Sequence, residues 1–214
     1  MSFDVPNFNT AMLLGTWEME LTETIAEFKE FNPSSIICIG AAEGYYAVGL
    51  ALNFPNLKID AFEQDIVYRD FLRDLAGKNQ CTNVNILGKC EGQILAKTLG
   101  KSGDSPLIIC DIEGGEVDLL TIHDVPQLKS SFILVEVHEM YVEDCEKILL
   151  DRFSNTHVSR VIKGKVRDTK DIPQEVSWLR LISKKSSLIT LMNEGRPYPM
   201  NWILFCPTKH TPCT

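Results

Sequence analysis

The 214-residue chain lacks the long apolar runs and paired cysteines that mark membrane-spanning and secreted proteins. No uninterrupted apolar run approaches the roughly 18 residues of a membrane span, and the N-terminus lacks the basic region and apolar core of a signal peptide. The seven cysteines form no C-x-x-C pair, a pattern that fits neither a disulfide framework nor a zinc site. We therefore expect a protein of the reducing cytoplasm with no membrane partner.

Positive charge is also scarce. The chain has 21 Lys and Arg residues against 29 Asp and Glu residues, a net charge of -8, which argues against a surface that binds nucleic acid by neutralising phosphates. The best candidate for a basic patch is Lys163, Lys165, Arg167 and Lys170, and a solvated strand-and-turn face is the simpler interpretation of it. Nucleic acid is therefore not an expected partner.

Five short apolar segments, rich in Ile, Val and Leu, have the character of buried parallel strands. They cover residues 34–40, 57–63, 84–88, 106–111 and 131–138. Helix-like stretches at residues 45–53, 66–79, 92–100 and 115–123 alternate with them. This alternation predicts an α/β fold with a parallel sheet, right-handed crossovers and helices on both faces.

The remaining segments complete one expected domain over residues 1–214. Residues 1–33 form an expected helical segment, residues 34–138 a cofactor-binding half, and residues 139–214 a half that completes the sheet. Within the last part we expect a helix at 143–153, a strand at 157–166, a helical or mixed stretch at 176–193 and a final strand at 201–207.

The turn after the first strand, Gly40-Ala41-Ala42-Glu43-Gly44, suggests a ligand without phosphate. A dinucleotide site needs G-x-G-x-x-G, and here the middle glycine is missing. The Glu43 carboxylate would repel a pyrophosphate, whereas S-adenosylmethionine carries a sulfonium and an ammonium and suits an acidic turn. Glu43 could equally stabilise the N-terminus of the following helix through the helix dipole.

The second strand ends in Glu63, about 20 residues after the glycines, where a carboxylate can accept hydrogen bonds from ribose hydroxyls. A solvated acid at the strand end is the alternative. Glu63 at this position indicates a nucleoside ligand but does not distinguish a nicotinamide dinucleotide from S-adenosylmethionine. The spacing of the glycines and the presence of Glu43 are the features that favour S-adenosylmethionine.

Three stretches resemble class I S-adenosylmethionine-dependent methyltransferases, and in particular FkbM-like methyltransferases and their relatives. They are IGAAEGYYAVGLA at residues 39–51, CDIEGGEVDLL at 110–120 and LVEVHE at 134–139. LGTWEMEL at 14–21 and RPYPMNWILFCP at 196–207 extend the resemblance over nearly the whole chain. The resemblance implies a Rossmann-like three-layer αβα sandwich with a mostly parallel seven-stranded sheet and an antiparallel last strand.

The resemblance also implies a cofactor, S-adenosyl-L-methionine, and residues that bind it. Gly40, Ala42 and Gly44 would approach its methionine part, Glu63 its ribose, and Cys90 or Glu91 its adenine. Asp111 would form the floor of the reaction site, and Glu18 would close over the cofactor. The full implied set is Glu18, Gly40, Ala41, Ala42, Glu43, Gly44, Tyr45, Glu63, Gln64, Cys90, Glu91 and Asp111.

Two positions depart from the family pattern. Cys38 stands where the family has an Asp that helps to hold the ammonium of the cofactor, and Ala42 stands where it has Asn. Glu43, Glu18 or Asp111 would have to compensate for the missing charge. A methyltransferase-like binding protein without turnover is therefore an alternative function.

Candidate catalytic residues cluster at the ends of the fourth and fifth strands. Glu136 and His138 are two residues apart on a strand and so point to the same side. We expect His138 to be the general base, Glu136 to orient it and Asp111 to lie beside them, although Glu136 and His138 could instead pair with backbone or a helix N-terminus. These groups and Glu113 could gather a divalent metal, as in some O-methyltransferases, but the spacing matches no recognised motif and we expect no metal.

Two absent motifs narrow the expected reaction. The chain has neither the Asn/Asp-Pro-Pro-Tyr/Phe motif of enzymes that methylate planar amines nor the Pro-Cys nucleophile of cytosine-C5 enzymes. The sequence therefore predicts an S-adenosylmethionine-dependent O-methyltransferase whose partner is a small-molecule or sugar acceptor. Two less favoured functions stay open, an RNA methyltransferase and a nicotinamide-dependent oxidoreductase, and so does a homodimer.

Overall fold

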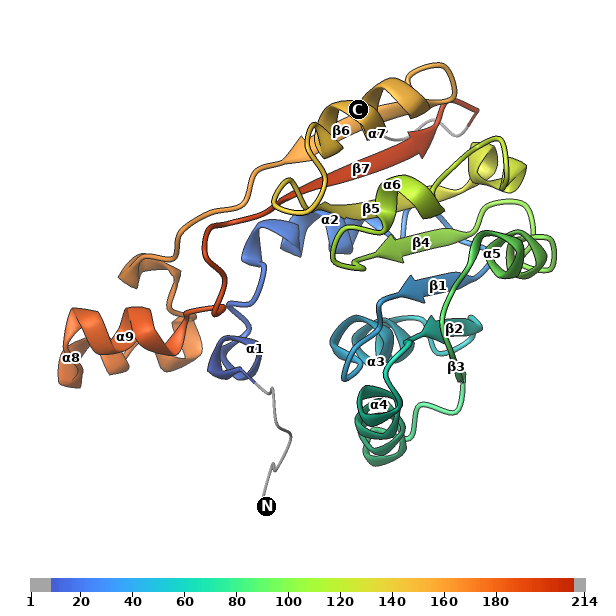
Figure 1. The fold of residues 1–214 in the computed structure, drawn as a ribbon. Helices are drawn as coiled ribbons and strands as arrows, with labels where there is room; N and C mark the ends of the chain where they lie inside the picture. Colours follow the sequence, from blue (N-terminus) through green and yellow to red (C-terminus); the bar gives the residue numbers. More distant parts are fainter. Residues whose placement is uncertain (1–8, 210–214) are drawn as a thin grey trace. The chain divides into compact units, whose positions relative to one another are not determined.

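The structure is a computed structural model that describes residues 9–209. This part of the chain groups into two compact units, which are described separately (Figure 1). Among the described residues, the sheet unit comprises 27–162 and 201–209, and the helical unit comprises 9–26 and 163–200. The helical unit thus combines two segments that are far apart in the sequence. A single domain, with parts at 1–33, 34–138 and 139–214, remains a prediction.

Seven strands form one sheet in the order β3-β2-β1-β4-β5-β7-β6 (Figure 1). Their bounds are β1 Ile36–Ile39, β2 Ile59–Phe62, β3 Val84–Leu87, β4 Leu107–Cys110, β5 Phe132–Val137, β6 His157–Ile162 and β7 Asn201–Pro207. Strands β1 to β5 are parallel, and β7 is antiparallel to both β5 and β6. The predicted mostly parallel sheet with an antiparallel last strand is confirmed.

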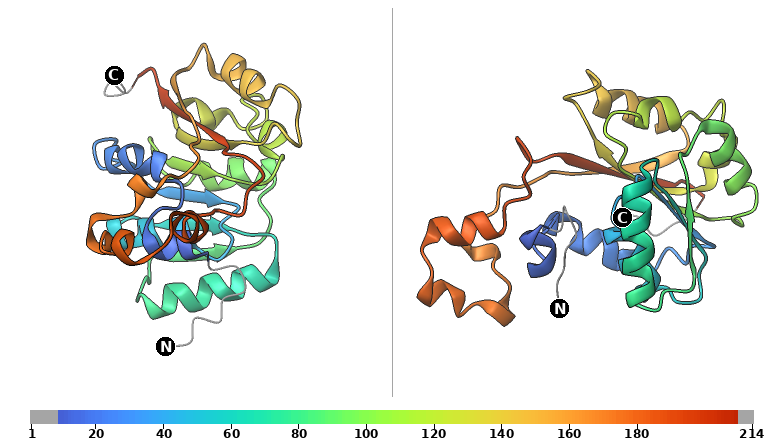
Figure 2. Two further views of the ribbon diagram at one scale, coloured as in Figure 1. Left: turned by 90° about the vertical axis from the view of Figure 1, so that its left-hand side faces the viewer. Right: turned by 60° about the horizontal axis from the view of Figure 1, so that its bottom comes forward.

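Helices cover both faces of this sheet (Figures 1 and 2). They are α3 Tyr45–Asn53, α4 Ile66–Lys78, α5 Gly92–Leu99, α6 Glu116–Leu119 and α7 Cys145–Phe153, with the 3₁₀ helix η2 Pro126–Ser130. Helices α5, α6, η2 and α7 pack against one face of the sheet, in a buried core that includes Ile203 of β7. Tyr46 of α3 instead contacts Trp202, with ring centroids 5.9 Å apart, and Trp202 points away from its neighbour Ile203 on the strand.

Local sequence explains where α4 begins and why α6 is short. The Asp65 side chain accepts a hydrogen bond from the Val67 N–H at 2.7 Å, which satisfies one of the free donors at the start of α4. Helix α6 ends at Leu119, whereas we expected helix as far as residue 123. The β-branched residues Thr121 and Ile122 follow, and their restricted side chains disfavour continued helix.

The helical unit has a small core and a buried ion-pair network. Its helices are α1 Thr10–Leu14, η1 Met19–Leu21, α2 Thr22–Glu27 (whose last residue falls in the sheet unit), η3 Thr169–Asp171, η4 Gln174–Val176, α8 Leu179–Ile182 and α9 Lys185–Leu191. Arg167 lies 2.6 Å from a Glu20 oxygen and 2.5 Å from a Glu194 oxygen, and its side chain is 7% exposed. Arg167 therefore belongs to an internal network, and the candidate basic patch loses one of its four charges.

Most of the described cysteines are free thiols. Cys38, Cys81, Cys90, Cys110 and Cys145 are free, whereas Cys206 on β7 is disulfide-bonded. The cysteine pattern did not predict a disulfide, so the bond at Cys206 is a departure from the expected reduced cysteines. Burial raises the pKa of Cys38 to about 12, so this position of β1 carries a neutral thiol, without the negative charge that an Asp would supply there.

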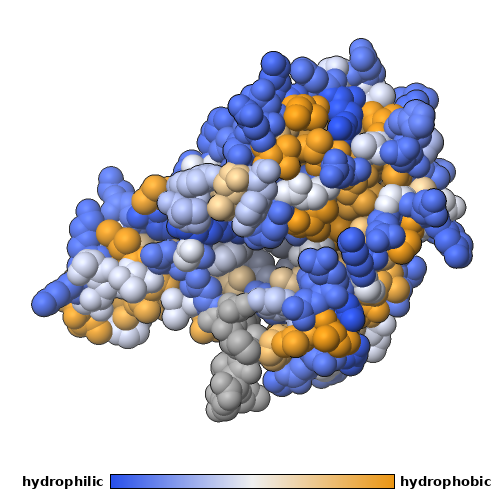
Figure 3. All heavy atoms as spheres, in the orientation of Figure 1, coloured by the Kyte–Doolittle hydropathy of each residue, from blue (hydrophilic) through white to orange (hydrophobic). Residues whose placement is uncertain are grey.

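The face of the molecule drawn in Figure 3 carries hydrophilic residues with apolar groups between them. Leu181 and Ile182, on the short helix α8, are among the most exposed large apolar side chains of the described residues. Among residues 9–209, no helix combines the length and apolar character that crossing a membrane requires.

Candidate functional site

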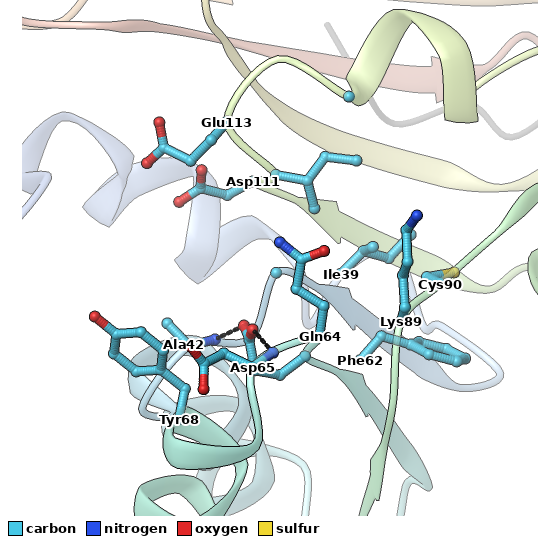
Figure 4. A pocket seen from close by; sticks show the side chains of 14 residues that line it. Ile39, Ala42, Phe62, Gln64, Asp65, Tyr68, Lys89, Cys90, Asp111 and Glu113 are labelled. Carbon is cyan, nitrogen blue, oxygen red and sulfur yellow. Dashed lines mark hydrogen bonds between the residues drawn. The ribbon is translucent and has the colours of Figure 1, made fainter.

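A pocket of about 560 Å³ lies within the sheet unit, at the carboxyl ends of β1, β2, β3 and β4 (Figure 4). It is lined by Ile39, Gly40, Ala42, Phe62, Glu63, Gln64, Asp65, Tyr68, Lys89, Cys90, Asp111, Ile112, Glu113 and Gly115. From β1 the chain crosses to β2 on one side, whereas β4 lies on the other side of β1, so the strand order reverses here. Open α/β sheets bind ligands at such reversal points.

Gly40 begins the turn above β1 with a φ of +78°, and its packing leaves no room for a side chain. A Cβ atom at this position would lie 1.6 Å from the carbonyl oxygen of Asp111. At Gly44, whose φ is +102°, a Cβ would lie 2.3 Å from Leu72 Cδ1 of helix α4. Gly40 is therefore required by packing against the backbone as well as by its positive φ, whereas Gly44 is favoured mainly by its positive φ, since the Leu72 side chain can shift.

Glu63 ties the end of β2 to this turn. One carboxylate oxygen accepts the N–H of Ala42 at 2.9 Å and the other accepts the N–H of Asp65 at 2.8 Å (Figure 4). The Ala42 residue is held at a φ of +44°, a conformation that a non-glycine residue adopts only when its surroundings enforce it. A carboxylate has about four lone-pair sites, so Glu63 can still accept hydrogen bonds from a ligand.

Negative side chains dominate the lining of the pocket. Four carboxylates, from Glu63, Asp65, Asp111 and Glu113, line it together with one ammonium, from Lys89. In Figure 4 the Asp111 and Glu113 carboxylates lie next to each other, on the side of the pocket opposite Asp65 and Tyr68. This distribution of charge favours a cationic ligand over one that carries phosphates.

Glu43 does not line the pocket. Its side chain is buried beside the turn, and burial raises the pKa of its carboxyl, an effect opposed by a backbone hydrogen bond and reinforced by the nearby charge of Glu63. The direct role expected for Glu43 in selecting a ligand therefore remains a prediction, while Glu63 and Asp111 contribute their charges at the pocket wall.

Several carboxylates surround the imidazole of His138 at the end of β5. Its Nδ1 lies 2.7 Å from Glu116 Oε1, and its Nε2 lies 3.2 Å from Glu136 Oε2 and 3.4 Å from Glu113 Oε2. Burial lowers the pKa of His138, but the close contacts with the Glu116 and Glu136 carboxylates and the negative charges of both outweigh that effect and raise it to about 10. The ring is thus protonated at neutral pH unless another cation displaces the proton, and a general-base role remains a prediction.

The structure brings part of the predicted site together. Gly40, Ala42, Glu63, Gln64, Cys90 and Asp111 all line the pocket, whereas Ala41, Glu43, Gly44, Tyr45, Glu91, Glu136 and His138 do not. Glu18 belongs to the helical unit, where its carboxylate pairs with Arg196, and closure over a cofactor remains a prediction. Burial raises the pKa of Cys90 to about 12, so it contributes a neutral thiol to the wall.

Three polar residues that line the pocket were not predicted from the sequence: Asp65, Tyr68 and Lys89. Asp65 and Tyr68 stand at the start of α4, and Lys89 follows β3 by two residues. Residues just after the carboxyl ends of parallel strands share one edge of the sheet. Position after a strand is therefore the signal that could identify all three.

Comparisons with known proteins relate the chain to methyltransferases through its fold. No family model matches the sequence, and neither does any curated protein. A Staphylococcus aureus structure described as a caffeoyl-CoA O-methyltransferase has a TM-score of 0.58 at 9% identity, covering 88% of this chain and 83% of that one.

Two further structures are similar in the same way. A Klebsiella pneumoniae structure described as an O-methyltransferase has a TM-score of 0.51 at 10% identity, covering 96% of this chain and 83% of that one. The human methyltransferase 10 domain containing protein has a TM-score of 0.51 at 12% identity, covering 88% of this chain and 80% of that one. At such identities the likeness concerns architecture, and the chain has the Rossmann-like α/β fold of these methyltransferases.

Proposed function

We propose that the chain is an S-adenosylmethionine-dependent methyltransferase that transfers the methyl group to an oxygen of a small molecule or sugar. The fold and the names of two similar structures support the general reaction. FkbM-like character, suggested by residues 39–51, 110–120 and 134–139, belongs to the same proposal. So does a location in the cytoplasm, which the five free thiols favour and the disulfide at Cys206 does not.

The observation that carries the proposal is the charge of the pocket at the point where the strand order reverses. Four carboxylates and one lysine line it, so a dinucleotide pyrophosphate would be repelled, whereas a sulfonium and an ammonium would be attracted. The turn also lacks the middle glycine of a pyrophosphate-binding loop, because Ala42 stands there.

Residues of the pocket could contact the ribose, the adenine and the methionine part of the proposed cofactor. The spare lone pairs of Glu63 would accept the ribose hydroxyls, and the apolar side chains of Ile39 and Phe62, with Cys90, would contact the adenine. Asp111 would lie nearest the methionine part and the reacting methyl group. Of the expected catalytic residues it is the one that lines the pocket, with His138 and Glu136 behind it.

Calorimetry with S-adenosylhomocysteine, in EDTA, tests the proposal on native protein, Glu63→Ala and Glu63→Gln. We expect one site per chain, weakened by about 1–3 kcal/mol in Glu63→Ala because charge-assisted hydrogen bonds to the ribose are lost. Glu63→Gln, which keeps one acceptor, should bind with intermediate affinity. The nicotinamide dinucleotide NADH serves as the competing ligand.

Two results would count against the proposal. Tighter binding of NADH than of S-adenosylhomocysteine would indicate an oxidoreductase. Equal affinity of the native protein and Glu63→Ala would remove Glu63 from the binding site.

A further inference from the structure

Three side chains around the end of β4 and β5 place potential metal ligands close together. Asp111, Glu113 and His138 each offer one ligand atom, and these atoms all lie within 4.8 Å of one another. His138 Nε2 is 3.6 Å from Asp111 Oδ1 and 3.4 Å from Glu113 Oε2. Ligands of one cation at about 2.0–2.2 Å lie roughly 3–3.5 Å apart, so small side-chain movements would complete such a site.

The orientation of His138 gives an independent indication. Its side chain is fully buried, and Nδ1 donates to the Glu116 carboxylate at 2.7 Å. With the proton on Nδ1, the neutral ring presents the lone pair of Nε2 to Asp111 and Glu113. Within the described part of the chain Nε2 is a buried atom that makes no regular hydrogen bond, and Glu136 Oε2 lies 3.2 Å from it.

A carboxylate behind a histidine is the usual companion of a metal ligand, because it fixes the tautomer and makes the ring a stronger donor. Glu116 has this position and a second role. Its oxygens accept the N–H groups of Ile112 and Gly114, each at 3.0 Å, and so hold the turn that carries Glu113. The same buried carboxylate thus positions two of the three candidate ligands.

We propose that Asp111, Glu113 and His138 bind one divalent cation at the edge of the pocket. Two carboxylates and one imidazole suit Mn²⁺, Fe²⁺, Co²⁺ or Zn²⁺. Asp111 and Glu113 also line the pocket, so the cation would be accessible to a bound molecule. In so far as the proposed methyl transfer holds, the cation would bind the acceptor oxygen and favour loss of its proton.

Titration with Mn²⁺ as the probe tests this site, with electron paramagnetic resonance to measure the free ion. We expect one Mn²⁺ to bind per native chain. Glu113→Gln and Asp111→Asn should each weaken binding by about tenfold or more, because a ligand oxygen with negative charge is removed. Glu113 is 67% exposed, so its substitution should leave folding intact, as circular dichroism would verify.

Asp65→Asn is the matched control, since it removes a carboxylate from the same pocket but keeps an oxygen that can cap α4. It should bind Mn²⁺ as the native chain does. Absence of Mn²⁺ binding, or equal weakening in Asp65→Asn and Glu113→Gln, would overturn the site. Binding of S-adenosylhomocysteine in EDTA reports on the cofactor pocket separately, so either proposal can fail alone.

Discussion

Two histidines, His138 directly after β5 and His157 at the start of β6, show how the surroundings of a residue decide its chemistry. His138 is surrounded by carboxylates, which raise its pKa. His157, at the start of β6, is buried among neutral groups, and burial lowers its pKa despite hydrogen bonds to the backbone of Ser131 and Leu128. A carbonyl can only accept, so His157 Nε2 donates to the Ser131 oxygen at 3.0 Å. Burial, which lowers the pKa of the ring, favours its neutral form.

This state of His157 predicts a pH dependence of stability. As pH falls through about 6.5, the unfolded chain gains a proton that the folded chain resists, so the free energy of unfolding should decrease. The loss attributable to one such group is at most about 1.4 kcal/mol per pH unit. Urea unfolding of the native chain and of His157→Gln, at pH values from 7.5 to 5.5, would measure it.

His157→Gln should show a shallower decrease than the native chain, because Gln can keep the bond to Ser131 without titrating. Parallel curves for the two proteins would mean that His157 takes up its proton equally in both states.

At the scale of elements, short apolar runs and periodicity in the sequence predict the strands and most helices, whereas packing in the folded chain explains why glycine is needed at position 40. Strands β1 to β5 lie within the predicted ranges, since short apolar runs bounded by polar residues report burial on both faces. The sequence also marks the turn at Gly40, but not why glycine is needed there. The reason is the carbonyl of Asp111, which follows β4 and approaches only when β1 and β4 pair.

Two glycine substitutions around β1 and α3 should have opposite effects. Gly40→Ala should destabilise the protein by about 3 kcal/mol or more, since it adds a clash with backbone to a strained positive φ. Gly49→Ala is the matched control, because Gly49 lies within α3 with open space around its Cβ position. It should stabilise by about 0.5–1 kcal/mol through helix propensity, and urea unfolding would measure both. A Gly40→Ala protein as stable as the native one would contradict the packing role.

At the scale of the whole molecule, the chain forms two units that its linear order does not reveal. The helical unit joins the N-terminal segment to residues 163–200 through Arg167, which meets Glu20 and Glu194 and donates to the Thr16 carbonyl at 2.9 Å. In the sequence Arg167 resembles a surface charge beside Lys163, Lys165 and Lys170. Its partner Glu20 lies 147 residues away, so only the folded chain shows the pairing.

Breaking this network should destabilise the helical unit. Arg167→Met leaves Glu20 buried without its partner, a change that costs about 3–5 kcal/mol when an ion pair is removed from one side. Hydrogen exchange should accelerate in residues 9–26 and 163–200, while β1, β4 and β5 keep their protection. Lys170→Met, at an exposed position of the same segment, should change exchange little. Uniform acceleration over both units would contradict this expectation.

Sequence patterns alone predict the succession of strands and helices along the chain, the glycine turn after β1 and the acid at the end of β2. These features follow from periodicity and from neighbours along the chain. The folded chain was needed to show that Glu116 orients His138, that Asp65, Tyr68 and Lys89 line the pocket, and that Arg167 is buried. Such contacts join atoms from segments far apart in the chain, and their geometry exists only once the sheet and the buried ion pairs have formed.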